Sequence, residues 1–485
     1  MQIKEKIPKF SLVIIAVISL WIISKISIGI VDGKLKAVYI PIGFSILIMI
    51  LYVVDKIGSF PLLSGLVFIY WIPFNSGLGH VSPFLEYMYP TEVGLWMLCL
   101  GILVYGSVSR SAQFYSAVGR FPFLPFVLLV VGSITANLVS GNRFALNELA
   151  QIRILCILPA VICFVFIYFL KTVKQAERLL WIFLISAGIL GLVYLFAPNI
   201  VNPDILDLLT SEIERTGRLK KIIKLPLCSM LTMSMESTAE CFTLIVALSF
   251  SLWVNYLSFR GRLRAAAVLA ISALVIIRGQ ARGALIASIC SVIVIQALSL
   301  RFKGYSSKFF LRGLLKPAIV ICSIAFTVTY LAITSPTYTY QQRIMNLYTN
   351  PLLAIDSRMH RWKTAAPVVL DNPLGVGIFG FPSADGASWA AHNLYLFLLL
   401  SFGIIGFIGF FWIFLRYTKV CWSGLHSNNS TRRLFCIAGM GCVTTLFVEG
   451  MVSPIYWSPW QVLMVWIPIG ITMAVATLPE EKYAK

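Results

Sequence analysis

Charged residues are scarce in this chain. They make up 12% of its 485 residues, whereas hydrophobic residues make up 59%, so the charged fraction is about half that of an ordinary soluble domain. A water-soluble fold would have nowhere to place this much apolar surface. The composition therefore excludes a soluble globular protein and favours one embedded in a lipid bilayer.

Acidic residues, histidines and paired cysteines are also few. The chain has 19 Asp and Glu and four His, and no Asp-x-Asp pattern or Cys/His cluster has the spacing of a metal site. The ten cysteines form no C-x-x-C pair and lie mostly in apolar runs, as small core residues do. We expect no disulfide, no metal and no cofactor.

A face of Lys and Arg interleaved with aromatic residues is lacking as well. The formal charge of +20 could suggest nucleic acid, but single-strand binding requires such a face. The basic residues instead fall mostly on alternate loops between apolar runs. We therefore expect no nucleic-acid partner.

Apolar runs of about 18 or more residues recur from end to end, each long enough to carry a helix across a hydrocarbon core of about 30 Å. The first run resembles a signal peptide, but no small-residue cleavage site follows it, so we interpret it as a retained helix. The sequence thus predicts an all-α, polytopic membrane helix bundle of about 14 transmembrane helices, a single integral membrane domain over 1–485. The predicted spans are approximately 11–31, 37–54, 58–74, 92–108, 121–139, 153–170, 179–196, 238–258, 264–277, 283–300, 317–335, 393–415, 434–453 and 461–478.

The distribution of basic residues predicts the orientation. With the N-terminus in the cytoplasm, the tails and loops on that side hold 23 Lys and Arg, and the short opposite loops hold six. This asymmetry is the one expected from the positive-inside rule. Both termini are therefore predicted to be cytoplasmic, and the basic cluster at 301–316 is most simply an orientation signal that faces anionic lipid.

Two connections are much longer than the others, and both are predicted to be extracytoplasmic loops. They cover residues 197–237 and 336–391. Binding and catalytic residues concentrate in long loops. The first could form an amphipathic helix on the membrane surface. The second contains Pro and Gly between Asp371 and Gly377, which favours tight turns over a long helix.

Two arginines flank a very short outer turn between helices. Arg278 and Arg282 lie within Ile276-Ile277-Arg278-Gly279-Gln280-Ala281-Arg282-Gly283. A guanidinium group at this depth is costly unless it binds an anion. If the segment were helical, the i,i+4 spacing would place both groups on one face, where together they could bind a diphosphate. The alternative is that both side chains extend to lipid headgroups.

The second long loop adds further polar candidates. It contains Arg358, Arg361 and Trp362, and it ends at His392-Asn393, which opens the next apolar run. A neutral imidazole can accept a hydroxyl proton near pH 7, so His392 is a candidate general base. Asn393 could orient it or cap the helix. The alternative for His392 is a solvated residue at a helix entrance.

Three motifs in this order resemble the O-antigen ligase and polymerase superfamily of bacterial membrane glycosyltransferases. They are Arg282-Gly283 at the start of a helix, Arg358-x-x-x-Trp362 continuing to Asn372-Pro373-Leu374-Gly375-Val376-Gly377, and His392-Asn393-Leu394-Tyr395 leading to Gly403-Ile404-Ile405-Gly406. They cover roughly residues 275–415. The N-terminal half is similar only in being a bundle of helices.

The resemblance implies a GT-C-like fold and an enzyme, namely a metal-independent, inverting glycosyltransferase. Its donor would be an undecaprenyl-diphosphate-linked oligosaccharide at the outer face of the bacterial cell (inner) membrane. By the same resemblance, Arg282 and Arg358 would neutralise the departing diphosphate and His392 would deprotonate the acceptor. Arg278, Arg361, Trp362 and Asn393 would bind substrate.

The chain departs from the family pattern at one position. Many members carry an acidic residue shortly before the Gly-x-x-Gly that follows His-Asn, where this chain has Leu400-Ser401-Phe402. Glu449, near the outer end of its predicted span, could supply a carboxylate instead. A structural pairing of Glu449 with an arginine is the alternative.

We favour a polymerase of a surface polysaccharide, because two long outer loops suit a growing donor and an incoming lipid-linked acceptor. An O-antigen ligase, which moves the glycan to lipid A core or another terminal acceptor, uses the same chemistry and stays open. A lipid-oligosaccharide flippase would instead need short loops and a charged cavity at the midplane. Expected partners are membrane lipid and the chain-length regulator and flippase of the same pathway.

Overall fold

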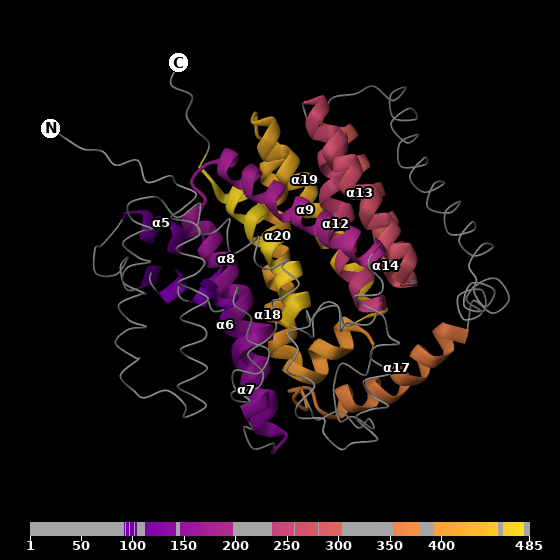
Figure 1. The fold of residues 1–485 in the computed structure, drawn as a ribbon. Coiled ribbons are helices and arrows are strands. Elements are labelled where there is room, and N and C mark those ends of the chain that lie inside the picture. Colours follow the sequence, from indigo (N-terminus) through magenta and orange to yellow (C-terminus); the bar gives the residue numbers. More distant parts are fainter. Residues whose placement is uncertain are drawn as a thin grey trace, which may run out of the picture. The chain divides into compact units, whose positions relative to one another are not determined.

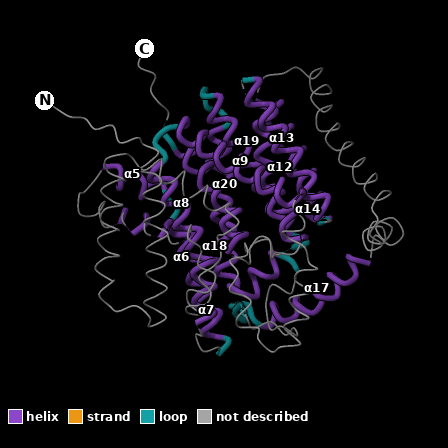
Figure 2. Tube along the Cα trace, in the orientation of Figure 1, coloured by secondary structure: helices purple, strands orange, loops and turns teal. Residues whose placement is uncertain are grey.

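The described part of the protein is built from helices. The computed structural model describes residues 112–141, 146–196, 235–256, 258–279, 281–302, 353–378, 392–453 and 459–479, and part of 92–103. No strand occurs within these ranges (Figure 2), which confirms the all-α prediction. Five described helices are long and apolar enough to cross a membrane, or six if one bent pair is a single span. The protein is an integral membrane protein, whereas the predicted total of about 14 helices stays a prediction.

Several predicted segments lie outside the described residues. These are the spans 11–31, 37–54, 58–74 and 317–335, most of the loop 197–237, whose last three residues already belong to a helix, and much of the loop 336–391.

The chain divides into two compact units, of which the first comprises Met1–Phe121 and Val161–Met233. Its described helices are α5 (Ala112–Arg120), most of α8 (Leu158–Phe169) and α9 (Val173–Phe196). Side chains of α5 hold the end of α8, since Arg120 Nη2 donates to the carbonyl of Ile167 at 3.1 Å and Gln113 Nε2 donates to that of Tyr168 at 2.9 Å.

The second unit comprises Pro122–Ala160 and Ser234–Lys485 and contains every candidate site residue. Within it, α12 packs against α13, α14 and α19, α19 also packs against α14 and α20, and α6 runs along α18 (Figure 1). Its helices are α6 (Phe123–Val139), α7 (Leu146–Ile152), the π-helical η1 (Arg153–Ile157), α12 (Met235–Asn255), α13 (Phe259–Gly279), α14 (Arg282–Phe302), α17 (Leu353–Asp371), α18 (Leu394–Gly424), α19 (Ser430–Gly450) and α20 (Pro459–Thr477).

Two helices differ from the sequence-based expectation. Helix α18 continues to Gly424, beyond the expected end at 415, and so includes Arg416 and Lys419. Basic side chains can extend from a helix to water, so their presence did not mark its end. Helix α17 occupies 19 residues of the segment 336–391. It is held by an apolar face, in which Ala365 is fully buried together with Val376 and Leu400.

Helix α18 is broken at Gly403, and the turn that follows α17 fills the break. Gly403 has φ 61° and ψ −172°, outside the helical region. Ile404 N donates to the carbonyl of Pro373 at 2.9 Å, and Val376 N donates to the carbonyl of Leu400 at 2.7 Å. In an unbroken helix Ile404 N would donate to Leu400 itself. Two hydrogen bonds to the turn thus replace one within the helix and satisfy both backbone groups.

Close backbone contact makes this arrangement specific for glycine. A Cβ at Gly403 would lie 2.3 Å from the carbonyl carbon and oxygen of Leu374, and a Cβ at Gly375 would lie 2.7 Å from Gly403 N. Gly375 and Gly377 also have positive φ, 88° and 81°, which only glycine adopts readily. The predicted tight turn between Asp371 and Gly377 is confirmed, and its function here is to seal the break in α18.

We predict that Gly403→Ala destabilises the protein by about 2 kcal/mol or more, because alanine is strained at positive φ and its Cβ overlaps the Leu374 backbone. The midpoint of thermal unfolding in detergent checks this. Gly119→Ala in α5 is the matched control, since no atom lies within 4 Å of its Cβ position and alanine favours a helix. An unchanged midpoint for Gly403→Ala would show that the break tolerates a side chain.

Candidate functional site

Arg278 and Arg282 lie at one end of the second unit, on two different helices. Arg278 is in the last turn of α13, and α14 begins at Arg282. Both side chains are half-buried. The prediction that they share one helical face is therefore not met, because α13 ends at Gly279. Arg282 instead stands at a helix N-terminus, where unpaired backbone N–H groups and the helix dipole favour an anion.

Helix α17 presents Arg358, Trp362 and Ala365 on one face. These residues are spaced i, i+4 and i+7, and Ala365 faces the buried cluster with Leu400 of α18. The side chain of Trp362 is half-buried, and its Nε1 is buried without a hydrogen-bond partner in the described part of the chain. A buried donor of this kind is unusual and is available to an acceptor atom of a substrate.

His392 and Asn393 form the entrance to α18. The Asn393 side chain caps the helix, with Oδ1 accepting from Tyr395 N at 2.9 Å and from Leu396 N at 3.1 Å. This confirms the capping alternative for Asn393. His392 precedes the cap, is half-buried and has φ 47°. A left-handed backbone is uncommon for a non-glycine residue and often marks a functional position.

The C-terminal end of α19 holds the entrance of α18 in place. Asn393 Nδ2 donates to the carbonyl of Met451 at 3.0 Å, and Tyr395 donates its hydroxyl to the carbonyl of Phe447 at 2.7 Å. The same end reaches α14, because a Cβ at Gly283 would lie 3.5 Å from Glu449 Oε1. The residues that open α14 and α18 are therefore joined through one helix end.

A buried and a half-buried glutamate lie near Arg358. Glu449 is 1% exposed, and it interacts electrostatically with Glu240 of α12 and with Arg358. Its Oε2 has no hydrogen-bond partner among the described residues. Glu240 accepts from Ser453 Oγ at 2.6 Å and from Gln461 Nε2 at 3.3 Å. Of the two alternatives for Glu449, the electrostatic pairing with an arginine is the one with structural support.

Sequence reasoning missed Glu240. It lies in the predicted span 238–258, and an acidic residue inside an apolar span usually has a function or a buried partner. That signal alone could have identified it. Ser453 and Gln461 carry no comparable signal, because both are common neutral residues at helix ends.

The electrostatics of the site keep His392 neutral. Burial, followed by the positive charges of Arg361 and Arg358, lowers the pKa of His392 from 6.5 to about 4. A histidine with a lowered pKa is uncharged at pH 7 and can accept a proton. This effect also shows that Arg358 and Arg361 lie close to His392.

The arrangement combines guanidinium groups from several elements with one neutral imidazole. Arg278 and Arg282 lie at the turn between α13 and α14, and Arg358 and Arg361 lie on α17 beside His392. Such a set can bind a diphosphate and accept a proton from a nearby hydroxyl group. In the described part of the chain no three His, Cys, Asp or Glu side chains are grouped to hold a metal ion.

Comparison with known proteins links the site to a family. Residues 265–411 match the family model described as O-antigen ligase, which confirms the resemblance to the O-antigen ligase and polymerase superfamily. The match includes the four arginines and His392, and it ends within α18 after the break at Gly403. No curated protein matches the chain.

We predict that Arg361→Gln raises the pKa of His392 from about 4 toward 6.5, because one of the charges that disfavour the imidazolium is removed. Near pH 5 His392 would then be protonated to a larger extent in the variant than in the wild type. The pH dependence of diethylpyrocarbonate modification at His392, followed by mass spectrometry, measures this.

Lys363→Gln is the matched control, since Lys363 is an exposed cation on the same helix and is not among the charges that act on His392. An identical profile for Arg361→Gln and the wild type would contradict the proximity of Arg361 to His392.

Proposed function

From the match of residues 265–411 to the O-antigen ligase family model, we propose that this membrane protein is a polymerase of a bacterial surface polysaccharide. It would transfer glycan from an undecaprenyl-diphosphate donor to a hydroxyl group of a lipid-linked repeat unit. The observation that carries the proposal is a half-buried, neutral His392 close to Arg358 and Arg361, at the end of α18 that is joined to Arg282-Gly283 through α19.

His392 would act as the general base. Its imidazole takes the proton of the acceptor hydroxyl while the hydroxyl oxygen attacks the anomeric carbon of the donor sugar. The bond between that carbon and the diphosphate oxygen breaks on the opposite face, so the configuration is inverted. The products are the elongated glycan and undecaprenyl diphosphate, and the proton stays on His392 until water removes it.

The arginines would stabilise the leaving group. Negative charge develops on the diphosphate as the bond to the sugar breaks, and guanidinium groups in fixed positions stabilise that charge without reorganising. Arg282 adds the N-terminus of α14 to this effect. In this proposal the arginines replace a divalent cation, so transfer is metal-independent. Trp362 and Asn393 would lie along the bound glycan.

Donor binding would also strengthen the base. An imidazole with a pKa of about 4 is a weak proton acceptor at pH 7. Part of that lowering comes from the positive charges of Arg361 and Arg358. A bound diphosphate neutralises these charges, which moves the pKa of His392 back toward its ordinary value. His392 would therefore accept a proton more readily once a donor is in place.

Polymerase and ligase differ in the acceptor and not in this chemistry. Two long segments, 197–237 and 336–391, suit a growing donor and an incoming lipid-linked acceptor, which favours polymerase. The matched family is that of O-antigen ligase, so transfer to lipid A core or another terminal acceptor is the second candidate. In either case we place the site on the outer face of the inner membrane, with both termini cytoplasmic. The chain-length regulator and flippase of the pathway would be its partners.

Arg282→Ala, Arg358→Ala and His392→Ala should each lower transfer by purified protein by about 100-fold or more, since each removes a transition-state contact. The measurement is product formation from a lipid-linked donor in detergent. Lys363→Ala is the matched control for the α17 arginine and His426→Ala for the histidine, because both lie outside the site. Near-normal transfer by any of the three site variants would contradict the role of that residue.

A deletion strain should accumulate single repeat units on the lipid carrier, or single units on the final acceptor, because no enzyme remains to join them. A size-resolving gel that compares carrier-bound material with finished surface polysaccharide measures this. Long chains that accumulate on the carrier, with none on the final acceptor, would instead identify a ligase.

A further inference from the structure

A polar cavity lies at the end of the second unit opposite to the candidate site. Its volume is about 330 Å³. It is formed where α12 and α14 end and where α13 and α19 begin, whereas the candidate site lies at the other ends of these helices. Helices of 21 residues separate the two places by about 30 Å, so the cavity is distinct from the site.

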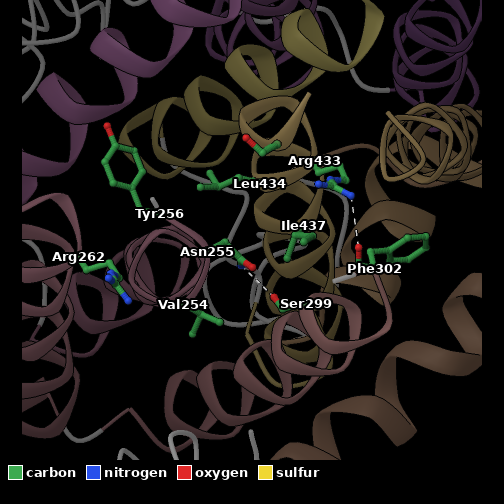
Figure 3. A pocket seen from close by; sticks show the side chains of 10 residues that line it. Val254, Asn255, Tyr256, Arg262, Ser299, Phe302, Arg433, Leu434 and Ile437 are labelled. Atoms are coloured by element: carbon green, nitrogen blue, oxygen red, sulfur yellow. Dashed lines mark hydrogen bonds between the residues drawn. The ribbon is translucent and has the colours of Figure 1, made fainter. Parts of the chain in front are cut away.

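The lining of the cavity combines cations with an apolar wall (Figure 3). Arg262 of α13 and Arg433 of α19 supply the guanidinium groups, and Asn255 donates to Ser299 Oγ at 2.9 Å. The apolar lining residues are Val254, Phe302, Leu434 and Ile437.

No carboxylate balances the two arginines. Among the described residues neither Arg262 nor Arg433 has an ion pair, and no Asp or Glu lines the cavity. The segments 254–264, 299–303 and 429–437 contain seven Lys and Arg and no Asp or Glu. A positive cavity of this kind lowers the free energy of a bound anion.

Neighbouring basic side chains have other contacts. Arg432 Nη2 donates to the carbonyl of Ala476 at 2.7 Å, and the Arg301 guanidinium lies 5.9 Å from the ring centre of Trp422. Arg433 uses Nη1 for the carbonyl of Phe302 at 3.3 Å, which fixes its head at the end of α14. This single contact leaves further N–H groups of Arg433 for a ligand.

Two large apolar side chains are exposed between the arginines beside the cavity. On α13 the side chains of Phe259 and Leu263 flank Arg262 and are 73% and 62% exposed. Apolar side chains next to Lys or Arg are typical of helix segments at the lipid interface, where they contact acyl chains. A ligand seated here would thus meet guanidinium groups at its head and apolar surface along its body.

We propose that this cavity binds the phosphate headgroup of an anionic phospholipid, with an acyl chain lying along Phe259 and Leu263. Basic pockets between membrane helices are suited to such headgroups. A zwitterionic lipid would bind more weakly, because the arginines repel the cationic group of its head. A free inorganic phosphate is also an anion, but it has no acyl chain to contact the apolar wall and would therefore bind more weakly than the lipid. The site is separate from the transfer chemistry, so it stands whether or not the proposed function does.

Native mass spectrometry of the full-length protein in detergent tests this with three probes: phosphatidylglycerol, phosphatidylcholine and inorganic phosphate. We expect the wild type to retain phosphatidylglycerol and to hold phosphatidylcholine no better than background. The double variant Arg262→Gln/Arg433→Gln should bind phosphatidylglycerol at least 10-fold more weakly. Arg264→Gln is the matched control, because Arg264 is exposed on the same helix but does not line the cavity.

A second variant tests the cavity without touching its charge. Val254→Trp should fill the space and also weaken phosphatidylglycerol binding, with both arginines retained. Unchanged retention in the double variant, or an equal loss in Arg264→Gln, would overturn the proposal. So would displacement of phosphatidylglycerol by millimolar inorganic phosphate, which would identify a free anion as the ligand.

Discussion

The exchange of backbone hydrogen bonds at Gly403 is the interaction on which the candidate site depends. The turn after α17 takes over the carbonyl of Leu400 and the N–H of Ile404, which the break in α18 has set free. Buried backbone groups left without partners in a bilayer would cost several kcal/mol each. The break therefore cannot persist without the turn, and the turn cannot leave without exposing the break. This mutual requirement fixes α17, and with it Arg358 and Trp362, against the helix that His392 precedes.

The end of α19 provides the second constraint. A backbone carbonyl at Met451 holds Asn393, and the buried Glu449 lies beside Gly283 and acts on Arg358. A buried carboxyl group without polar partners would be costly. The interaction of Glu449 with Arg358 thus links the end of α19 to α17. The close approach of this helix end also explains the glycine after Arg282. A Cβ at Gly283 would lie 2.4 Å from a methyl group of Val452.

The sequence predicted the positions of those helices that consist of one long apolar run. The spans predicted at 121–139, 283–300 and 434–453 correspond to α6, α14 and α19 within a few residues, because a bilayer requires a fixed apolar length. Helix α17 was not expected, since its stability comes from packing of Ala365 on α18 and not from an apolar run. The motifs predicted the residues of the candidate site one by one. They did not predict the contacts that bring these residues together. No local pattern reveals that Gly375 and Gly403 meet, or that Glu240 lies beside Glu449.

The two ends of the second unit differ in whether acidic side chains accompany the arginines. This difference agrees with what each proposal requires. At the candidate site Glu449 interacts with Arg358 and with Glu240, whereas at the cavity no Asp or Glu of the described segments lines the space beside Arg262 and Arg433. An enzyme must release undecaprenyl diphosphate after every transfer, and a group of unbalanced arginines would hold this product and slow turnover. The Glu240 carboxylate, which accepts hydrogen bonds from Ser453 and Gln461, would lower the net positive charge near the product. A structural lipid has no such requirement, because it need not leave, so an unbalanced positive cavity suits it.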